Sequence, residues 1–560
     1  MGKNKFPLGQ LLIEKKIITQ EQLDIALRKQ KETGELLGAT LLDLGFIDEE
    51  TVFIPLLAGQ LGVDFISFKD LQINPEAIKK LPAKFASHYN IIPCDFKDNV
   101  LKIATTQPLD VHLIDELSSV VKSKVKTVLA SEKDITEAIR QYYGVGAETI
   151  EQMMGSVQQS AVSEKEVAGI EDESEASISK FLNQIIIEAY RDRATDIHIE
   201  PYEDELKIRY RIDGILYDAK VPANIKVFKD AINSRIKILS NLNIAEKRVP
   251  QDGRFKVRVN DLDIDLRVSF LPTQHGESVV LRVLNSARLY DLEELGFNKD
   301  ELKIIENILK RPHGIIFLTG PTGSGKTTTL YSFLSKVNTE DKKIITIEDP
   351  VEYQLKGITQ IQINPKVGLT FAQGLRSMLR HDPDIMMVGE VRDIETAEIA
   401  IQVALTGHLV LSTLHTNDAP SGVARLLDMG VEPYLITSTV ECLIAQRLVR
   451  VICPSCRQSY ILPDDVLEEF GEEKGKEVIA YKGKGCESCH FTGYIGRESI
   501  YEILVFSEEI RGLVMERATA NHIREKAAAQ GMKTLLHSGW AKIKKGITTV
   551  EEIFRVTKDE

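Results

Sequence analysis

The chain has 560 residues and a net charge of −13, and six of its residues are cysteines. A chain of this length exceeds what one hydrophobic core supports, so we expect three or four domains. The acidic balance argues against nucleic-acid partners, which need a basic surface. No apolar run is long enough for a transmembrane helix, and the N-terminus lacks the apolar core of a secretory signal. So few cysteines do not suggest a secreted disulfide scaffold, and we expect a cytoplasmic protein.

Residues 1–65 predict a helical module with an internal repeat. The segment 8–30 matches the segment 37–59, and each copy opens with a Leu-Gly pair, at Gly9 and Gly38. The spacing by itself supports two helix-turn-helix units that share a core.

The repeat resembles the cyclic di-GMP-binding N-terminal module of bacterial secretion ATPases, which carries two tandem Leu-Gly motifs. Two residues depart from that pattern, Pro7 and Lys16. Two interpretations of this module therefore stay open: it binds cyclic di-GMP, or its role is purely structural.

Residues 66–143 predict a small α/β domain, with strands at 90–94 and 100–104 and helices at 110–121 and 135–143. Its single cysteine is expected in the core. The domain resembles the N-terminal domain shared by pilus and type II secretion ATPases. It offers no chemistry of its own, so docking to a partner is the expected role.

Residues 144–177 predict a flexible acidic linker. The segment is rich in Glu, Ser, Gln and Gly and contains no aromatic residue. Such a composition does not bury enough apolar area to offset its ordering entropy. The alternative is a structured helix around 150–154.

Residues 178–287 predict a second domain that opens with a helix. Apolar and basic residues alternate along 206–212, which is typical of a half-buried strand. The expected strands are 197–199, 206–212, 263–268 and 278–283. Arg267 and Arg282 fall in these strands. Arginines on a sheet face are usually only solvated, but their number just before a nucleotide-binding domain suggests that some reach phosphate.

Residues 288–297 form a short connector, and 298–560 alternate apolar strands and helices, the pattern of a parallel sheet covered on both faces. Within this part, 320–327 reads G-x-x-x-x-G-K-T between an apolar strand and a helix, which predicts a phosphate-binding loop. Glycines let backbone N–H groups close around phosphate, and the helix N-terminus adds its positive end. Lys326 is expected to reach the β- and γ-phosphates, and Thr327 to hold Mg²⁺. The candidate nucleotide-binding residues here are Gly320, Thr322, Gly323, Ser324, Gly325, Lys326, Thr327 and Thr328.

Three further predicted strands, at 343–347, 384–388 and 408–414, are followed or bracketed by polar residues. In chain order these are Glu348, Asp349, Glu352, Glu390, His408 and His415. Carboxylates at the carboxyl end of a strand lie where open α/β sheets bind ligands. Each feature is weak by itself, but their order behind a phosphate loop predicts a nucleotide site.

These segments resemble the four signature boxes of the type II/IV secretion ATPase superfamily: Walker A at 320–327, the Asp box at 346–352, an atypical Walker B at 388–393 and the His box at 407–415. The resemblance implies a multidomain α/β protein, with a RecA-like P-loop ATPase domain preceded by a PAS-like α/β domain. It also implies an ATP- and Mg²⁺-dependent homohexamer at the cytoplasmic face of the inner membrane, peripheral rather than inserted. Its expected partners are a membrane platform protein and cytoplasmic accessory proteins.

The same resemblance implies roles for the polar residues. Glu352 is expected to be the catalytic base that orients water, and Glu390 to support Mg²⁺ and that water. The other residues of these boxes are expected to shape the site or sense the γ-phosphate: Glu348, Asp349, His408 and His415.

Four arginines also match positions of the superfamily. Arg267 and Arg282 resemble arginines that reach the phosphates from the preceding domain. Arg376 and Arg380 resemble a second pair near the subunit interface. Arginines contributed across a domain boundary would make hydrolysis depend on domain closure.

Two C-x-x-C pairs, Cys453 with Cys456 and Cys486 with Cys489, predict a tetrahedral zinc site. The alternatives are a redox pair or disulfides, which a cytoplasmic location disfavours. We expect a structural staple in a small inserted subdomain near 450–495, without catalysis. Cys442 is expected in the core of an apolar helix.

The tetracysteine insert and the long N-terminal region resemble pilus-extension and type II secretion ATPases, whereas the retraction ATPases of the superfamily lack both. The resemblance therefore predicts a motor for type IV pilus assembly, with type II secretion as the alternative. A third candidate is a nucleotide-gated scaffold without motor activity. A DNA-translocating motor is disfavoured by the acidic balance.

Overall fold

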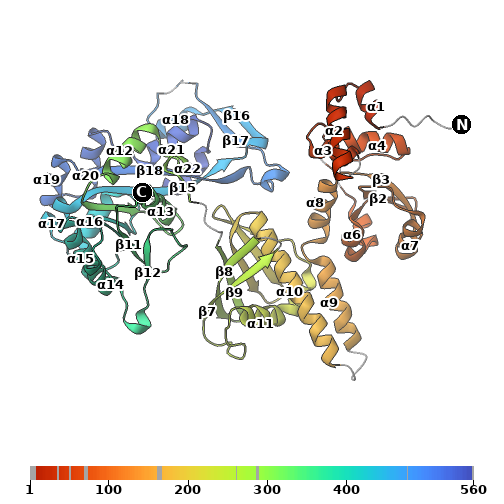
Figure 1. Cartoon of the computed structure of the whole chain (residues 1–560), viewed down its shortest axis with the longest axis horizontal. Coiled ribbons are helices and arrows are strands. Elements are labelled where there is room, and N and C mark those ends of the chain that lie inside the picture. Colours follow the sequence, from red (N-terminus) through yellow and green to blue (C-terminus); the bar gives the residue numbers. More distant parts are fainter. Residues whose placement is uncertain are drawn as a thin grey trace. The chain divides into compact units, whose positions relative to one another are not determined.

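The structure is a computed structural model (Figure 1). It describes residues 8–34, 37–48, 52–68, 73–160, 167–259, 262–284, 289–473, 475 and 477–557. Two compact units make up the chain, Met1–Val283 and Leu284–Glu560. Both combine helices and sheets, so the predicted α/β multidomain class is confirmed.

The first unit opens with the helices of the predicted repeat. They are α1 (Leu8–Glu14), α2 (Gln20–Thr33), α3 (Leu37–Asp43) and α4 (Ile54–Leu61). Helices α1 and α3 begin at equivalent positions of the two copies, and Leu12 and Leu41 are both fully buried in one shared core. Lys16, one of the two departures from the motif, has a positive φ of 56° in the turn after α1. The other, Pro7, lies outside the described residues.

A three-stranded sheet follows, in the order β1-β2-β3. Its elements are α5 (Pro75–Lys80), α6 (Ala83–Tyr89), β1 (Ile91–Lys97), β2 (Val100–Thr105), α7 (Val111–Val121), β3 (Lys124–Leu129) and α8 (Glu132–Tyr143). Asp110 caps α7 by accepting the Leu113 N–H at 2.7 Å, which explains why the helix begins where the sequence predicts. Strand β3 was not predicted; its exposed Lys124 and Lys126 alternate with half-buried residues.

Two helices occupy most of the segment predicted as a linker, α9 (Ala147–Ser160) and α10 (Val167–Arg191). Ile150 and Met153 on α9 are buried in the same hydrophobic cluster as Phe181 of α10. The structure therefore corresponds here to the alternative, a structured helix. Ile150 and Met153, three residues apart, give α9 an apolar stripe that packs on α10, and most of the stability of a helix comes from such packing.

The rest of the first unit is a six-stranded sheet in the order β6-β5-β4-β9-β8-β7. Its elements are β4 (Ala194–Pro201), β5 (Leu206–Ile212), β6 (Ile215–Asp218), η2 (Ala223–Phe228), α11 (Lys229–Leu239), β7 (Gln251–Val259), β8 (Leu262–Thr273) and β9 (Gly276–Leu284). The apolar residues of the strands form one core with α10 and α11. Arg267 and Arg282 alternate with these buried residues and so lie on the opposite face. The sequence predicted neither β6 nor β7.

The second unit contains a seven-stranded sheet in the order β12-β11-β13-β14-β10-β15-β18. The strands are β10 (Gly314–Thr319), β11 (Ile344–Glu348), β12 (Thr359–Gln362), β13 (Ile385–Val388), β14 (Leu409–Leu414), β15 (Val440–Ile452) and β18 (Tyr494–Val505). All neighbouring pairs are parallel except β15 with β18. The carboxyl ends of β10, β11, β13 and β14 therefore meet at one edge, which brings the segments behind these strands together.

Helices cover both faces of this sheet and build two hydrophobic clusters (Figure 1). The helices are α12 (Lys299–Leu309), α13 (Lys326–Val337), α14 (Phe371–Met378), α15 (Ile394–Leu405), α16 (Ala419–Asp428), α17 (Pro433–Thr439), α19 (Glu508–Met515), α20 (Ala520–Ala529), α21 (Leu535–Lys544) and α22 (Val550–Thr557). Between β15 and β18 lies an insert with α18 (Asp464–Glu469) and a hairpin of β16 (Arg457–Ile461) and β17 (Ile479–Gly483).

Cys442 is fully buried, as expected, but it lies in strand β15 and not in a helix. It pairs with Ile316 of β10, and β15 lies between β10 and β18 in the sheet. The prediction of a helix was wrong because a short apolar run buried on both faces has no periodicity that separates a strand from a helix.

Candidate nucleotide site and tetracysteine cluster

The predicted phosphate loop joins β10 to α13 at the carboxyl edge of the sheet. Gly320 has a φ of +147° and Gly325, which precedes the first helical residue Lys326, has a φ of +90°. A Cβ on Gly325 would lie 2.8 Å from Gln446 Nε2. Both the backbone and the close approach therefore require glycine at this turn.

Lys326 is held on the loop itself. Its Nζ donates to the carbonyl oxygens of Gly320 at 2.6 Å and Pro321 at 3.1 Å. Burial lowers the pKa of Lys326 to about 8, opposed by the charge of Glu390 and reinforced by that of Arg447. A partly buried cation whose charged form is disfavoured in this way gains stability from a phosphate ligand.

The hydroxyl groups of the loop fit a phosphate and a metal ion. Ser324 Oγ is buried and has no hydrogen-bond partner in the part of the chain that the structure describes. Thr327 and Thr322 are exposed. A buried donor that the protein leaves unpaired is expected to bind a ligand oxygen. Thr327, exposed at the first turn of α13, is the residue that would hold a Mg²⁺ ion.

Glu348 ends β11 inside a set of hydrogen-bond donors. Tyr331 donates its hydroxyl proton to Glu348 Oε2, and Thr346 Oγ1 donates to Oε1. Gln360 Nε2 also donates to Oε1, at 3.2 Å. The side chain is buried and its oxygens are occupied by protein donors, so Glu348 acts as an anchor for the neighbouring loop.

Glu352 lies in the loop that follows, half-buried, and its backbone N–H donates to Tyr331 Oη at 3.2 Å. Asp349 is exposed and is joined to Pro350 by a cis peptide bond. The loop that carries Glu352 is thus connected to α13, the helix that starts at the phosphate loop.

Glu390 follows β13, and its charge acts on Lys326 by raising the pKa of that lysine. Its carboxylate pairs with Arg392 Nη2 at 2.5 Å and accepts from His415 Nε2 at 3.1 Å. The structure therefore joins Glu390 and His415 of two boxes directly, at the edge of the sheet where Lys326 begins α13.

His408 is not brought to this edge. It precedes β14, and its carbonyl accepts the N–H of Gly314 at the beginning of β10. Its ring contacts Val403 O at 2.9 Å and Thr406 Oγ1 at 3.1 Å. Because β14 is six residues long, roughly 20 Å of strand separates His408 from the carboxyl edge. His408 thus has no place beside the phosphate loop of its own chain, which corrects the expectation that both histidines sense the γ-phosphate.

Arg376 and Arg380 lie on and just after α14, on the surface. Arg376 pairs with Glu395 at 2.8 Å, and Arg380 donates to the Arg376 carbonyl at 2.9 Å and to Ser377 Oγ at 3.3 Å. Both guanidinium groups are exposed, and such surface pairs contribute little to stability. Neither contact ties these arginines to the phosphate loop.

Arg267 and Arg282 belong to the six-stranded sheet of the first unit. Arg282 Nε donates to Asp196 Oδ1 at 2.9 Å, and 59% of its side chain is exposed. To bind a phosphate, Arg282 would have to leave the Asp196 carboxylate or contact both groups. The predicted roles of both arginines stay predictions.

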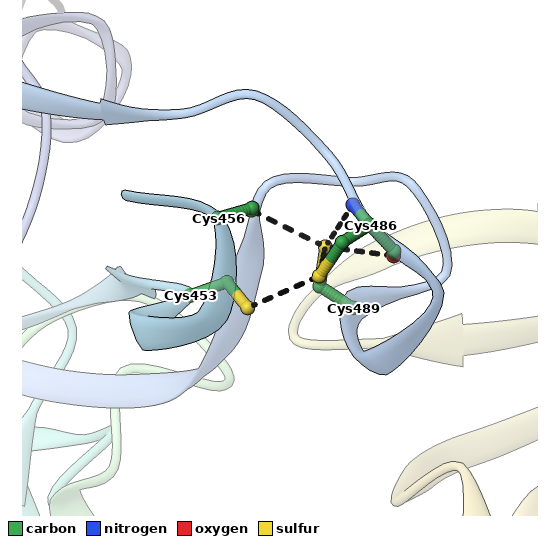
Figure 2. Close-up of side chains that lie close together, drawn as sticks. All are labelled: Cys453, Cys456, Cys486 and Cys489. Atoms are coloured by element: carbon green, nitrogen blue, oxygen red, sulfur yellow. Dashed lines mark hydrogen bonds between the residues drawn. The ribbon is translucent and has the colours of Figure 1, made fainter. Parts of the chain in front are cut away.

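The four predicted cysteines form one cluster in the insert (Figure 2). Their sulfur atoms all lie within 4.8 Å of one another. The Sγ–Sγ distances are 3.7 Å for Cys453 and Cys486, 3.9 Å for Cys456 and Cys489, and 3.7 Å for Cys486 and Cys489. Four thiolates 2.3 Å from one tetrahedral Zn²⁺ would be about 3.8 Å apart. The geometry fits zinc with no open position.

Backbone groups around this cluster favour thiolates. Cys486 N–H donates to Cys489 Sγ at 3.1 Å, Gly485 N–H to Cys456 Sγ at 3.3 Å, and Gly493 N–H to Cys489 Sγ at 3.3 Å. Such donors stabilise negative charge on sulfur, as a zinc site requires. A zinc ion held by four cysteines stabilises the fold around it and does no chemistry.

Sequence reasoning missed the side chains that brace the nucleotide site from behind. Tyr331 and Gln360 hold the Glu352 loop, and Gln446 and Arg447 of β15 lie against the phosphate loop. These residues belong to no recognisable sequence motif. Tyr331 is a tyrosine in an amphipathic helix, and Gln446 and Arg447 are two polar residues in an apolar strand. Only the neighbouring positions of β10 and β15 bring Gln446 and Arg447 to the loop.

None of the helices that the structure describes combines the length and the hydrophobicity that a bilayer span requires.

The fold and the site define a P-loop ATPase of RecA-like architecture. The chain belongs to the type II/IV secretion system protein family, whose model matches residues 171–555. A second family model, the MshEN domain, matches residues 61–149. The predicted family and enzyme class are therefore confirmed. The MshEN match falls mainly on the small α/β domain and hardly touches the helical repeat.

Curated relatives match nearly the whole chain. It is 41% identical over 556 residues to the type IV pilus assembly ATPase PilB of Myxococcus xanthus, covering 98% of both chains. It is 42% identical over 557 residues to the type II secretion system protein E of Xanthomonas campestris pv. campestris, again over 98% of both. The ATPase DotB of Legionella pneumophila matches with a TM-score of 0.50 and 22% identity, over 68% of this chain and 96% of that one. This last match shows the fold alone.

Proposed function

We propose that this chain hydrolyses ATP to power type IV pilus assembly, as a homohexamer at the cytoplasmic face of the inner membrane. The observation that carries the proposal is the match over 98% of both chains to a type IV pilus assembly ATPase. The site supports it, because Glu390 and His415 are hydrogen-bonded at the edge of the sheet that carries the phosphate loop with Lys326. The expected partners are a membrane platform protein and cytoplasmic accessory proteins.

In this proposal the loop N–H groups, Ser324 and Lys326 bind the ATP phosphates, and Thr327 and Glu390 hold Mg²⁺. The metal ion neutralises charge on the transferred phosphoryl group. Glu352 orients the attacking water and accepts its proton. His415, fixed by Glu390, is placed to report on the γ-phosphate.

The arginines make turnover depend on domain closure. Arg267 and Arg282 share the polar face of the six-stranded sheet, and we propose that they reach the phosphates when that face approaches a phosphate loop. Arg376 and Arg380, exposed on the ATPase domain, are proposed to act across a subunit boundary. Charge supplied from a second domain links each hydrolysis step to a movement.

Type II secretion is the second candidate, favoured by the 42% identity to a type II secretion system protein E. We predict that Lys326→Ala in the native host abolishes surface pili and leaves protein secretion intact, because the loop loses its phosphate cation. Counting pili and assaying secreted proteins in the same strain measures both outcomes.

Lys336→Ala is the matched control, since Lys336 is an exposed lysine on the same helix, 3.8 Å from Glu306. The control strain is expected to keep both functions. If the Lys326→Ala strain lost secretion and kept its pili, the chain would be assigned to type II secretion instead of pilus assembly.

We further propose that the N-terminal repeat binds cyclic di-GMP. The two copies present Gly9 and Gly38 at equivalent places of α1 and α3, as in the tandem Leu-Gly motifs of the family's module. We predict saturable binding of fluorescent cyclic di-GMP to the full chain with Mg-ADP in excess, so that the phosphate loop is occupied. Displacement by unlabelled cyclic di-GMP but not by GTP is the expected control, and a titration without saturation would leave only the structural role.

A further inference from the structure

Tyr331 is a fully buried tyrosine five residues beyond Lys326 on α13. Its hydroxyl group donates to the Glu348 carboxylate and accepts the backbone N–H of Glu352 at 3.2 Å. One oxygen atom thus links the helix of the phosphate loop to the loop that carries Glu352.

The direction of these hydrogen bonds is fixed by Glu348. Thr346 Oγ1 and Gln360 Nε2 occupy its Oε1, so Oε2 is the oxygen that accepts from Tyr331. The tyrosine proton therefore points at Glu348, and its lone pairs accept the N–H of Glu352 at 3.2 Å and Gln360 Nε2 at 3.4 Å. Burial, together with the adjacent carboxylate, raises the pKa of Tyr331, so the hydroxyl group keeps its proton.

The loop is also held just after Glu352. Gln360 Oε1 accepts the N–H of Leu355 at 2.7 Å, and Gln360 Nε2 donates to the Tyr353 carbonyl at 3.1 Å. The Tyr353 ring packs edge-on against the Tyr331 ring, with centroids 4.5 Å apart. The backbone of Glu352 itself, by contrast, is bonded to the Tyr331 hydroxyl.

We infer that Tyr331 is a positioning residue for ATP hydrolysis, whose hydroxyl group sets the place of Glu352 relative to the phosphate loop. The inference rests on the proposed role of Glu352 as the base. Because α13 is continuous from Lys326 to Tyr331, the helix fixes the distance between the bound phosphates and this hydroxyl group. Small displacements of a catalytic group are costly in rate even when binding is unaffected.

Tyr331→Phe removes the hydroxyl group and keeps the ring. We expect kcat to fall about 10- to 100-fold while the KM for Mg-ATP changes less than about threefold. Steady-state phosphate release on the full chain gives both constants. Tyr353→Phe is the matched control, since it makes the same chemical change in the packed ring of the same loop, and it is expected to keep the wild-type kcat.

Combining Tyr331→Phe with Glu352→Gln distinguishes a positioning role of Tyr331 from a general loss of folding. In single-turnover measurements, Tyr331→Phe is expected to have no further effect on the residual rate of Glu352→Gln, because the two act through one group. Circular dichroism and the thermal midpoint of Tyr331→Phe are expected to remain those of a folded chain.

The inference is overturned if Tyr331→Phe turns over like the wild type, if its KM rises as much as its kcat falls, or if it slows Glu352→Gln as strongly as it slows the wild type. A wild-type rate for Glu352→Gln alone would instead overturn the proposed base, whatever the behaviour of Tyr331→Phe. The two failures are therefore distinguishable.

Discussion

Replacing Glu352 by glutamine is expected to slow ATP hydrolysis by about 10²- to 10⁴-fold, the usual contribution of a general base. Glutamine keeps the size of the side chain and a hydrogen bond to water, but it cannot take up the proton. Two of the contacts that hold this loop use backbone groups, the Glu352 N–H bonded to Tyr331 and the Tyr353 carbonyl bonded to Gln360, and both remain when the carboxylate is replaced. ATP binding, measured with a fluorescent analogue, is therefore expected to stay within about threefold of the wild type.

Glu340→Gln gives the control, since Glu340 is an exposed carboxylate in the turn after α13. It is expected to change neither turnover nor binding. A full rate of phosphate release by Glu352→Gln would refute the role of Glu352. In the host, the same variant tests the proposed motor activity. If the variant protein binds ATP without hydrolysing it and the strain still makes pili, the alternative of a nucleotide-gated scaffold is favoured.

The phosphate loop was predictable because all its determinants are local. Gly320, Gly325 and Lys326 act through backbone angles and a helix N-terminus that a few adjacent residues define. The meeting of Glu390 and His415 was predictable too, because the carboxyl ends of parallel strands share an edge.

His408 shows the limit of reasoning from motif order. His408 and His415 stand before and after the same strand, and the resemblance implied that both sense the γ-phosphate. Yet a parallel strand brings only its carboxyl end to the ligand edge, so His408 pairs with the start of β10 instead. The strand direction alone could have separated the two histidines.

The bracing residues were out of reach for a different reason. Tyr331, Gln360 and Gln446 act through side-chain contacts with partners up to 117 residues away. No spacing rule covers such distances, and each residue type is ordinary in its own element. Helix α9 was only the alternative to a flexible linker, because Ile150 and Met153 become a helix face only against α10.

Removing zinc is expected to unfold the insert and weaken the sheet beside the phosphate loop. Cys453 follows β15 directly, its N–H donates to the Gly493 carbonyl at 2.9 Å, and β18 begins at the next residue. The cluster therefore clamps the ends of two paired strands, and β15 also lies along β10.

The size of the effect follows from the energy of such sites. A structural zinc supplies about 10–16 kcal/mol of apparent binding free energy, whereas a whole domain is stable by about 5–15 kcal/mol. We expect one zinc per purified chain, and a thermal midpoint lowered by more than about 10 °C in Cys453→Ser or after chelation. Metal analysis and calorimetry measure the two quantities.

Cys94→Ser separates this effect from the loss of any buried thiol. Cys94 is buried in the three-stranded sheet, its Sγ donates to the Lys102 carbonyl at 3.4 Å, and burial raises the pKa of its thiol to about 11. A neutral, hydrogen-bonded thiol outside the cluster has no reason to bind metal, so this variant is expected to keep its zinc. If all four clustered thiols of a metal-free chain reacted with a thiol reagent while its thermal midpoint stayed that of the wild type, the zinc staple would be refuted. If they stayed oxidised as disulfides, the redox alternative would replace it.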